Sequence, residues 1–266
     1  MSLFNRLKKN MRKKLTIVNV DGVVVENPEN LRRLIRDFAA IDGLKLFVHG
    51  EGTMASMVAE KWGITIRQTS DGRDIIDDRV MDLVTMVYGG LVNKRLVAIM
   101  QWRGLNAVGL TGVDLNLVVS NKVPVRPVNV GRVGTVKRVN TSMLIKLLDE
   151  GVVPVIAPLT HDGRGTLLNG DVKMFAYEIA RTLSTTYNVR VVNVFDEDNT
   201  KLISSCSHIK LLRRADYKAM REKGVVAPDA YPTFDNAFSA IDHGVSEVVL
   251  TNAALFSDLN AGTHIK

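Results

Sequence analysis

Short apolar, β-rich runs alternate with stretches of helical spacing along most of the chain. Asn27-Pro28 is typical of a helix N-terminus, because asparagine caps the first turn and proline suits its first position. Gly63 is typical of a helix end. The first segments are a strand at 15–20, a helix at 31–40, a strand at 45–49 and a helix at 53–62. This β-α-β-α order predicts a parallel sheet covered by helices.

The alternation continues to the C-terminus, with hairpin-like β segments in the middle where Pro124, Pro127, Gly131 and Gly134 interrupt the pattern. We expect helices at 79–102, 141–151, 171–187, 215–223 and 233–244, and strands at 107–111, 152–158, 189–195 and 247–251. The predicted fold class is α/β, a three-layer α/β/α sandwich with a mostly parallel central sheet and two lobes. The predicted parts are a basic tail over 1–14, an N-terminal lobe over 15–168 and a C-terminal lobe over 169–266.

The net charge of +7 is concentrated at the N-terminus. The first 14 residues carry six Lys and Arg and no acid, which leaves +1 for the other residues. The body therefore lacks the basic surface expected of a nucleic-acid-binding protein, and any such binding would be lost when residues 1–14 are removed. The tail is either disordered or loosely docked, or a short amphipathic helix that presents Phe4, Leu7 and Met11.

Several classes of protein are excluded by residue usage. With 266 residues of which 46% are hydrophobic, the chain can bury a full core without disulfides, and the single Cys206 fits a reducing, cytoplasmic setting. We expect no apolar run of membrane-spanning length and no secretory signal, because Asn19 and Asp21 interrupt the apolar stretch after the tail. The five histidines lack metal-ligand spacing, so we expect no metal site, and His49 fits a packed, hydrogen-bonded residue.

A glycine pair at Gly50-Glu51-Gly52 joins a predicted strand to a predicted helix. Glycines let the backbone approach an anion closely, and the free N–H groups and dipole of a helix N-terminus attract it. The same pattern also occurs in ordinary tight turns. By itself, the pair leaves both interpretations open.

Longer stretches together resemble acetylglutamate kinase, a member of the amino acid kinase family, from Leu15 to Ile265. The resemblance rests on six motifs: VHGEG at 48–52, MVYGGLVNKRLV at 86–97, AVGLTGVDLNL at 107–117, GRVG at 131–134, GVVPVIAP at 151–158 and GTHI at 262–265. It implies the amino acid kinase fold.

The resemblance also implies an activity and its partners. Such kinases use ATP with Mg²⁺ to phosphorylate the side-chain carboxylate of an N-acyl-L-glutamate in arginine biosynthesis. The acylglutamate is expected in the N-terminal lobe, the nucleotide in the C-terminal lobe, and a homodimer or larger homo-oligomer with the long helix at its interface. The implied substrate-binding positions are Gly50, Glu51, Gly52, Asp74 and Asp171, and the implied cofactor-binding positions are Gly22 and Lys173.

The sequence departs from the family at the charged positions, and no catalytic residue is intact. The first strand should read lysine-x-glycine-glycine, but it has Asn19 and Asp21 at the first lysine and the first glycine. Thr233 after Pro232 stands in place of a second lysine. Because a fixed donor to a developing oxyanion is commonly worth about 10²- to 10³-fold in rate, these losses predict a weak or absent kinase activity.

The substrate side of the predicted site is changed as well. Asp74 aligns with the arginine that pairs with the substrate carboxylate, next to Arg73, and Glu51 replaces the middle glycine. Two like charges at 4 Å repel by roughly 4 kcal/mol at an effective dielectric of about 20. Asp171 and Lys173 replace an asparagine and an aspartate. Lys173 is either a solvated first-turn lysine or a partial substitute for the lost charge.

The predicted cleft therefore has two possible characters. The cleft is expected to contain four acids, Asp21, Glu51, Asp74 and Asp171. Either they favour the binding of a cation or a cationic small molecule, or they point into water. The basic side chains that could move into the cleft are Arg73, Lys94 and Lys201. Two functions follow. One is an acylglutamate kinase with a rearranged or weakened site, and the other, which the residue chemistry favours, is a non-catalytic member that binds a ligand or pairs with an active kinase.

Overall fold

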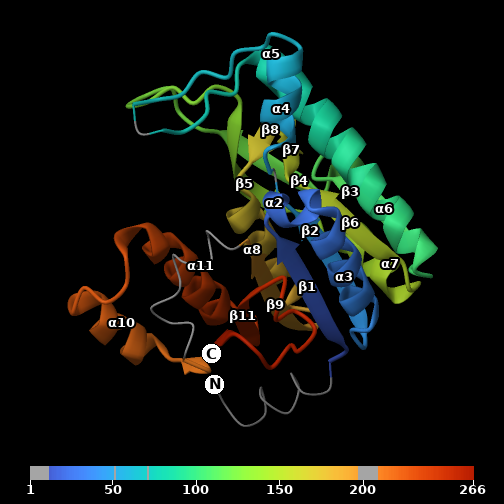
Figure 1. Ribbon diagram of the computed structural model, residues 1–266, viewed down its shortest axis with the longest axis vertical. Coiled ribbons are helices and arrows are strands. Elements are labelled where there is room, and N and C mark those ends of the chain that lie inside the picture. The colour runs from blue at the N-terminus through green and yellow to red at the C-terminus, as the bar shows by residue number, and fades with distance from the viewer. Residues whose placement is uncertain (1–11, 51, 71, 197–208) are drawn as a thin grey trace.

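An eight-stranded sheet forms the centre of the molecule (Figure 1). The computed structural model describes residues 12–50, 52–70, 72–196 and 209–266. The strands of this sheet are β1 (Lys14–Val20), β2 (Leu44–His49), β3 (Ala107–Thr111), β6 (Val153–Ala157), β9 (Asn188–Phe195), β10 (Leu211–Leu212), β11 (Glu247–Asn252) and β12 (Thr263–Ile265). Their order is β10-β12-β11-β9-β1-β2-β6-β3, and all neighbours are parallel except β11 and β12. The predicted mostly parallel sheet is confirmed.

Helices cover both faces of this sheet. One face packs against α3 (Pro28–Ala39), α4 (Met54–Lys61), α5 (Asp78–Val84), the π-helical turn η1 (Thr85–Val92) and α6 (Asn93–Trp102). The other face packs against α7 (Ser142–Asp149), α8 (Val172–Leu183) and α11 (Tyr231–Asp242). The remaining helical segments are α2 (Gly22–Glu26), η2 (Asp114–Asn116), α10 (Arg214–Glu222) and η4 (Pro228–Ala230). The chain is therefore the predicted three-layer α/β/α sandwich.

Both faces of β1 are buried because successive side chains of a strand point to opposite sides. Ile17 packs into one helical layer and Val18 into the other, and neither is exposed. Helix α3 begins as its sequence predicts: Asn27 Oδ1 accepts hydrogen bonds from the backbone N–H groups of Glu29 and Asn30, at 3.0 Å each. Local sequence signals therefore explain how the elements around β1 begin and pack.

A second, smaller sheet closes on itself beside the central one. It consists of β4 (Val118–Lys122), β5 (Val133–Val139), β7 (Leu159–His161) and β8 (Leu167–Gly170), in the order β4-β5-β8-β7. β4 pairs with β5 and β7 with β8 in antiparallel hairpins. The first hairpin was expected from the broken pattern before residue 139, whereas β7 and β8 were not expected.

The segment Asp78–Trp102 runs as one continuous 25-residue helical stretch through α5, η1 and α6. Its most apolar part has a mean hydropathy of 1.3, so by length and composition it could cross a membrane, contrary to the expectation that no segment is long enough. Val80, Met81 and Leu96 of this stretch are buried in the core of the fold. One side of the stretch therefore packs into the core, and 44% of its most apolar part is buried.

The two predicted lobes share the central sheet, because β1 pairs along its whole length with β9. The division near Leu168 falls within β8 and stays a prediction. The boundary of the tail falls at β1: Lys14 opens this strand, and Lys13 forms a 2.8 Å ion pair with Asp149. The interpretations of Phe4, Leu7 and Met11 lie outside the described residues.

Candidate functional site

A cleft of about 470 Å³ lies where β1 and β2 end and the second sheet begins. In parallel α/β sheets, ligands bind outside the carboxyl ends of the strands. Residues of α2, β5 and β8 line the cleft. The predicted site residues that it contains are Gly22, Gly50, Gly52 and Asp171, together with Asp21.

The two glycines of the turn are required by close packing. The Gly50 N–H donates to Val20 O at 2.7 Å, and a Cβ at Gly50 would stand 2.5 Å from the backbone N of Gly22. Gly52 has φ +61°, and a Cβ there would overlap Glu26 Oε1. Any side chain at these positions would separate the loops that form the cleft wall. Glu51 lies outside the described residues.

An internal carboxylate occupies the N-terminus of helix α4, which follows the glycine turn. Glu26 Oε1 accepts the backbone N–H of Met54 at 2.6 Å, and Oε2 accepts the Thr53 hydroxyl at 2.7 Å. These are donors that a bound anion would use at a helix N-terminus. The helix dipole at this turn is therefore already partly compensated by the protein's own negative charge.

A chain of uncharged side chains occupies the position at which the family resemblance expects a lysine. Asn19 Nδ2 donates to Asn193 Oδ1 at 3.0 Å, and Asn193 Nδ2 donates to the Tyr177 hydroxyl at 3.0 Å. All three residues are buried. Burial raises the pKa of Tyr177 above its usual value, although the hydrogen bond from Asn193 opposes this, so the phenol stays neutral. The network carries no positive charge.

Asn193 and Tyr177 were not predicted as site residues. The only signal in the sequence is one amide within the otherwise apolar run Val191-Val192-Asn193-Val194. A buried amide needs hydrogen-bond partners, so it points to a polar neighbour without identifying it.

Replacing Tyr177 by phenylalanine should lower the free energy of unfolding by about 1–2 kcal/mol, because Asn193 Nδ2 would be left buried without an acceptor. Urea denaturation measures this loss. Tyr231→Phe is the matched control: its ring stacks 4.0 Å from the Arg221 guanidinium, and its hydroxyl forms no hydrogen bond within the described residues. If the two variants lose the same stability, the network does not stabilise the fold.

The structure leaves several predicted positions outside the lining of the cleft. Asp74 accepts a hydrogen bond from Gln68 Nε2 at 2.9 Å in a separate β-bridge, and Thr233 is buried in the first turn of α11. Of the four acids expected to converge, only Asp21 and Asp171 line the cleft among the described residues. Asp171 Oδ1 also accepts the N–H of Met174 at 3.3 Å near the start of α8. Both acids are therefore placed at the cleft, and each has a further partner of its own.

The cations proposed as substitutes do not line the cleft among the described residues. Lys94 Nζ donates to Gly109 O and Asn93 Oδ1, at 3.1 Å each. Lys201 lies outside the described residues, and for Lys173 only the backbone in α8 is described.

His49, at the end of β2, is a structural residue. It is fully buried, and burial lowers its pKa to about 4, with the contact to Gly50 O opposing the shift, so the ring is neutral near pH 7. Asn93 Nδ2 lies 3.3 Å from His49 Nε2 and donates to Val155 O at 2.9 Å. These contacts hold the strand ends beneath the glycine turn, in agreement with the interpretation of His49 as a packed side chain.

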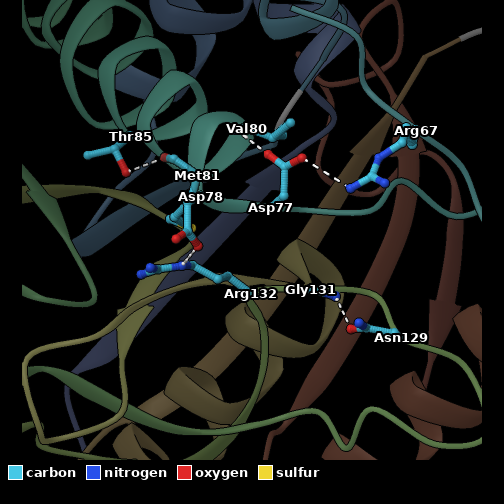
Figure 2. A network of polar contacts seen from close by, with 9 residues as sticks. All are labelled: Arg67, Asp77, Asp78, Val80, Met81, Thr85, Asn129, Gly131 and Arg132. Carbon is cyan, nitrogen blue, oxygen red and sulfur yellow. Dashed lines mark hydrogen bonds and ion pairs between the residues drawn. The ribbon is translucent and has the colours of Figure 1, made fainter.

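The second sheet is attached to helix α5 through the GRVG motif, as Figure 2 shows. Arg132 Nε contacts Asp78 Oδ1 at 2.6 Å, and the Arg132 N–H donates to Ile76 O at 2.6 Å. The hydrogen bond from Arg132 and its charge lower the pKa of Asp78. Asp77 Oδ1 caps α5 by accepting the N–H of Val80 at 3.1 Å. This attachment positions the next residue, Val133, in the cleft wall.

Magnesium in kinases is held by one or two carboxylates together with the substrate phosphates, and Asp21 and Asp171 are the described carboxylates that line the cleft. Within the described ranges, no group of three or more His, Cys, Asp and Glu side chains is arranged to hold a metal ion. The resemblance aligns its phosphate-facing lysines with Asn19 and Thr233, both of which are buried. Among the described residues, the lining of the cleft contains the glycines of the turn and no lysine or arginine.

Comparisons with known proteins relate this geometry to a family. A sequence model described as the amino acid kinase family matches residues 14–252. The chain is 44% identical to the acetylglutamate kinase of Bacteroides thetaiotaomicron over 258 residues, which cover 96% of this chain and 100% of that protein. It is 43% identical to the acetylglutamate kinase of Bacteroides fragilis over 269 residues, which cover 98% and 100%.

Solved structures agree in fold. The N-acetylglutamate synthase from Neisseria gonorrhoeae, complexed with coenzyme A and N-acetyl-glutamate, matches with a TM-score of 0.76 at 19% identity, over 100% of this chain and 63% of that one. The carbamate kinase from Giardia lamblia bound to AMP-PNP matches with a TM-score of 0.64 at 12% identity, over 96% and 99%. At such identities the likeness shows the fold alone. Together with the near full-length sequence matches, it confirms that the chain is an acetylglutamate kinase-like member of the amino acid kinase family.

Proposed function

We propose that this member of the family has weak or no ability to phosphorylate the side-chain carboxylate of an N-acyl-L-glutamate with ATP. The observation that carries the proposal is the neutral Asn19–Asn193–Tyr177 network, which fills the lysine position with buried amides. Asn19 lies on β1, which is packed on both faces, so its side chain cannot move aside to let a cation take its place.

The electrostatics of the cleft support the same conclusion. Forming an acyl phosphate brings two anions together, so the site must supply positive charge or backbone donors. Here Asp21 and Asp171 line the cleft, and Glu26 accepts the hydrogen bond of the Met54 N–H at the N-terminus of α4. Each missing donor is expected to cost about 10²- to 10³-fold in rate.

The preserved cleft favours a second function over complete loss of binding. A cavity of about 470 Å³ lined by glycine backbone remains at the position where α/β sheets bind ligands. We therefore propose, as the alternative, a non-catalytic protein that binds an acylglutamate-like ligand or regulates an active kinase.

The proposal extends to the oligomeric state of the protein and to its location in the cell. We expect a homodimer or larger homo-oligomer with the Asp78–Trp102 helical stretch at its interface. Met86, Leu91 and Trp102 on that stretch are 49%, 37% and 71% exposed, which is unusual for large apolar side chains unless a partner covers them. The single cysteine supports a reducing, cytoplasmic location.

Calorimetry and a turnover assay test the proposed function. The protein is titrated with magnesium and a non-hydrolysable ATP analogue, then with N-acetyl- and N-succinyl-glutamate, and kcat is measured beside the Bacteroides thetaiotaomicron relative. We expect kcat to be at least about 10²- to 10³-fold lower than that of the relative. Micromolar binding of both nucleotide and acylglutamate, with turnover within tenfold of the relative, would contradict the proposal. Acylglutamate binding without nucleotide binding would favour the non-catalytic alternative.

A further inference from the structure

A second cavity, separate from the cleft, lies between helices on one face of the central sheet. Its volume is about 380 Å³, within the range of small-molecule pockets. It is bounded by α2, α3, the start of α4 and the η1–α6 segment. Most of its lining is aliphatic and includes Leu31, Met54, Val92, Leu96 and Ile99.

The lining also contains three charged side chains, those of Glu26, Arg32 and Arg95. Within the described residues, only the Glu26 side chain among these three forms hydrogen bonds. Both carboxylate oxygens of Glu26 accept hydrogen bonds, from Met54 N at 2.6 Å and from the Thr53 hydroxyl at 2.7 Å. Arg32 on α3 and Arg95 on α6 are exposed, and within the part of the chain that the structure describes neither forms an ion pair or hydrogen bond. The apolar cavity therefore carries two guanidinium groups that pair with no acid within the described residues, and the Glu26 carboxylate shares its lining.

We propose that this cavity binds a small organic anion with an apolar body, such as a medium-chain carboxylate. The aliphatic lining would bury the hydrocarbon part, whose transfer from water provides the main driving force. The guanidinium groups would bind the carboxylate, because Arg presents a planar fork of donors that matches it.

Charge complementarity also argues against a second copy of the chain as the occupant. In a two-fold contact the same patch is present on both sides, so two copies of Arg32 and two of Arg95 would be brought into one contact. Like charges facing each other oppose such a contact. A separate anionic molecule meets no such repulsion.

The cavity shares two residues with the support of the glycine turn. Glu26 and Met54 line it, and the hydrogen bond between them begins helix α4 directly after Gly52 and Thr53 of the cleft wall. A ligand packed against this pair would reduce local opening of the first turn of α4. Binding in the cavity is therefore expected to reduce local opening of the cleft wall at Gly52 and Thr53.

Titration of the full chain with octanoate, by calorimetry, tests the proposal. We expect octanoate to bind. Octanol lacks the charge and acetate lacks the apolar body, so both should bind at least about tenfold more weakly than octanoate. Arg32→Gln and Arg95→Gln should each weaken octanoate binding about tenfold or more. Arg36→Gln is the matched control, because Arg36 lies on the same helix but pairs with Asp37 at 2.8 Å outside the cavity.

Two further measurements complete the test. Hydrogen exchange of the Met54 amide should slow when octanoate binds, and the oligomeric state should not change. The proposal is overturned if octanoate does not bind, if octanol binds equally well, or if the two Arg→Gln variants behave like Arg36→Gln. Dissociation of an oligomer on octanoate binding would instead identify a second copy as the occupant. None of these outcomes depends on nucleotide or acylglutamate, so they are independent of the kinase assay.

Discussion

Replacement of Gly131 by alanine is expected to lower the free energy of unfolding by about 3 kcal/mol or more. Gly131 has φ +78° and pairs with Ile76 in an isolated parallel bridge. An added Cβ would overlap the carbonyl of Ile76 and lie 2.6 Å from its carbon. Because the obstructing atoms belong to the backbone, no side-chain rotation relieves the overlap, and the loop must move away from α5.

Urea denaturation of Gly131→Ala and Gly104→Ala separates the two causes of this loss. Gly104 has φ +79°, but a Cβ there would meet no atom within 4 Å. Its substitution should therefore show only the conformational cost of a left-handed alanine, about 1–2 kcal/mol. Equal losses at the two positions would mean that the Ile76–Gly131 contact contributes nothing, and that the GRVG segment is not held against α5 as Figure 2 shows.

Replacement of Glu247 by glutamine is expected to lower the free energy of unfolding by about 1.5–3 kcal/mol. Glu247 is 5% exposed, and its carboxylate contacts Arg190 Nε at 2.6 Å, Lys266 Nζ at 2.7 Å and His264 Nδ1 at 3.0 Å. Glutamine keeps the shape but leaves two cations without their counter-charge. This is the range for hydrogen bonds to a charged group, and the larger cost of a buried ion pair does not apply because Arg190 and Lys266 are 36% and 56% exposed.

The loss at Glu247 should depend on pH. Burial raises the pKa of Glu247, but the hydrogen bonds from Lys266 and His264, with the charges of Arg190 and Lys266, outweigh it and lower the pKa below its usual 4.5. A carboxylate with a depressed pKa stabilises the fold fully above its unfolded pKa, and this contribution is lost as the pH falls through the folded pKa. The difference in stability between the wild type and Glu247→Gln should therefore be constant near neutrality and shrink below about pH 4.5.

Denaturation curves measured between neutral and acidic pH check this dependence. Glu222→Gln on α10 is the matched control, since Glu222 is exposed and forms no ion pair within the described ranges. Its stability should follow that of the wild type at every pH. A Glu247→Gln loss that grows as the pH falls would contradict the sign of the pKa shift.

Most secondary structure could be predicted from the sequence because its causes are local. The apolar spacing of 31–40 and the asparagine cap at residue 27 lie within the helix that they specify. The apolar run at 45–49 is buried on both faces and became β2. The motifs near residues 48–52 and 131–134 identified the family, and with it the three-layer fold.

The contents of the site depend on contacts between residues far apart in the chain, which no local pattern specifies. Asn19 meets Asn193 across 174 positions, and Glu26 reaches Met54 across 28. Asp74 was predicted in the cleft by alignment alone; it pairs with Gln68 in a β-bridge and is not among the residues that line the cleft, so its role stays a prediction.

The sequence by itself therefore determined most of the elements and the family, because residue identity and short-range spacing are sufficient for these. Only the tertiary structure decided which polar groups meet around the cleft. The amides of Asn19 and Asn193 pair with each other, and the Glu26 carboxylate occupies a helix terminus, because the fold brings polar groups that are distant in the chain within hydrogen-bonding distance.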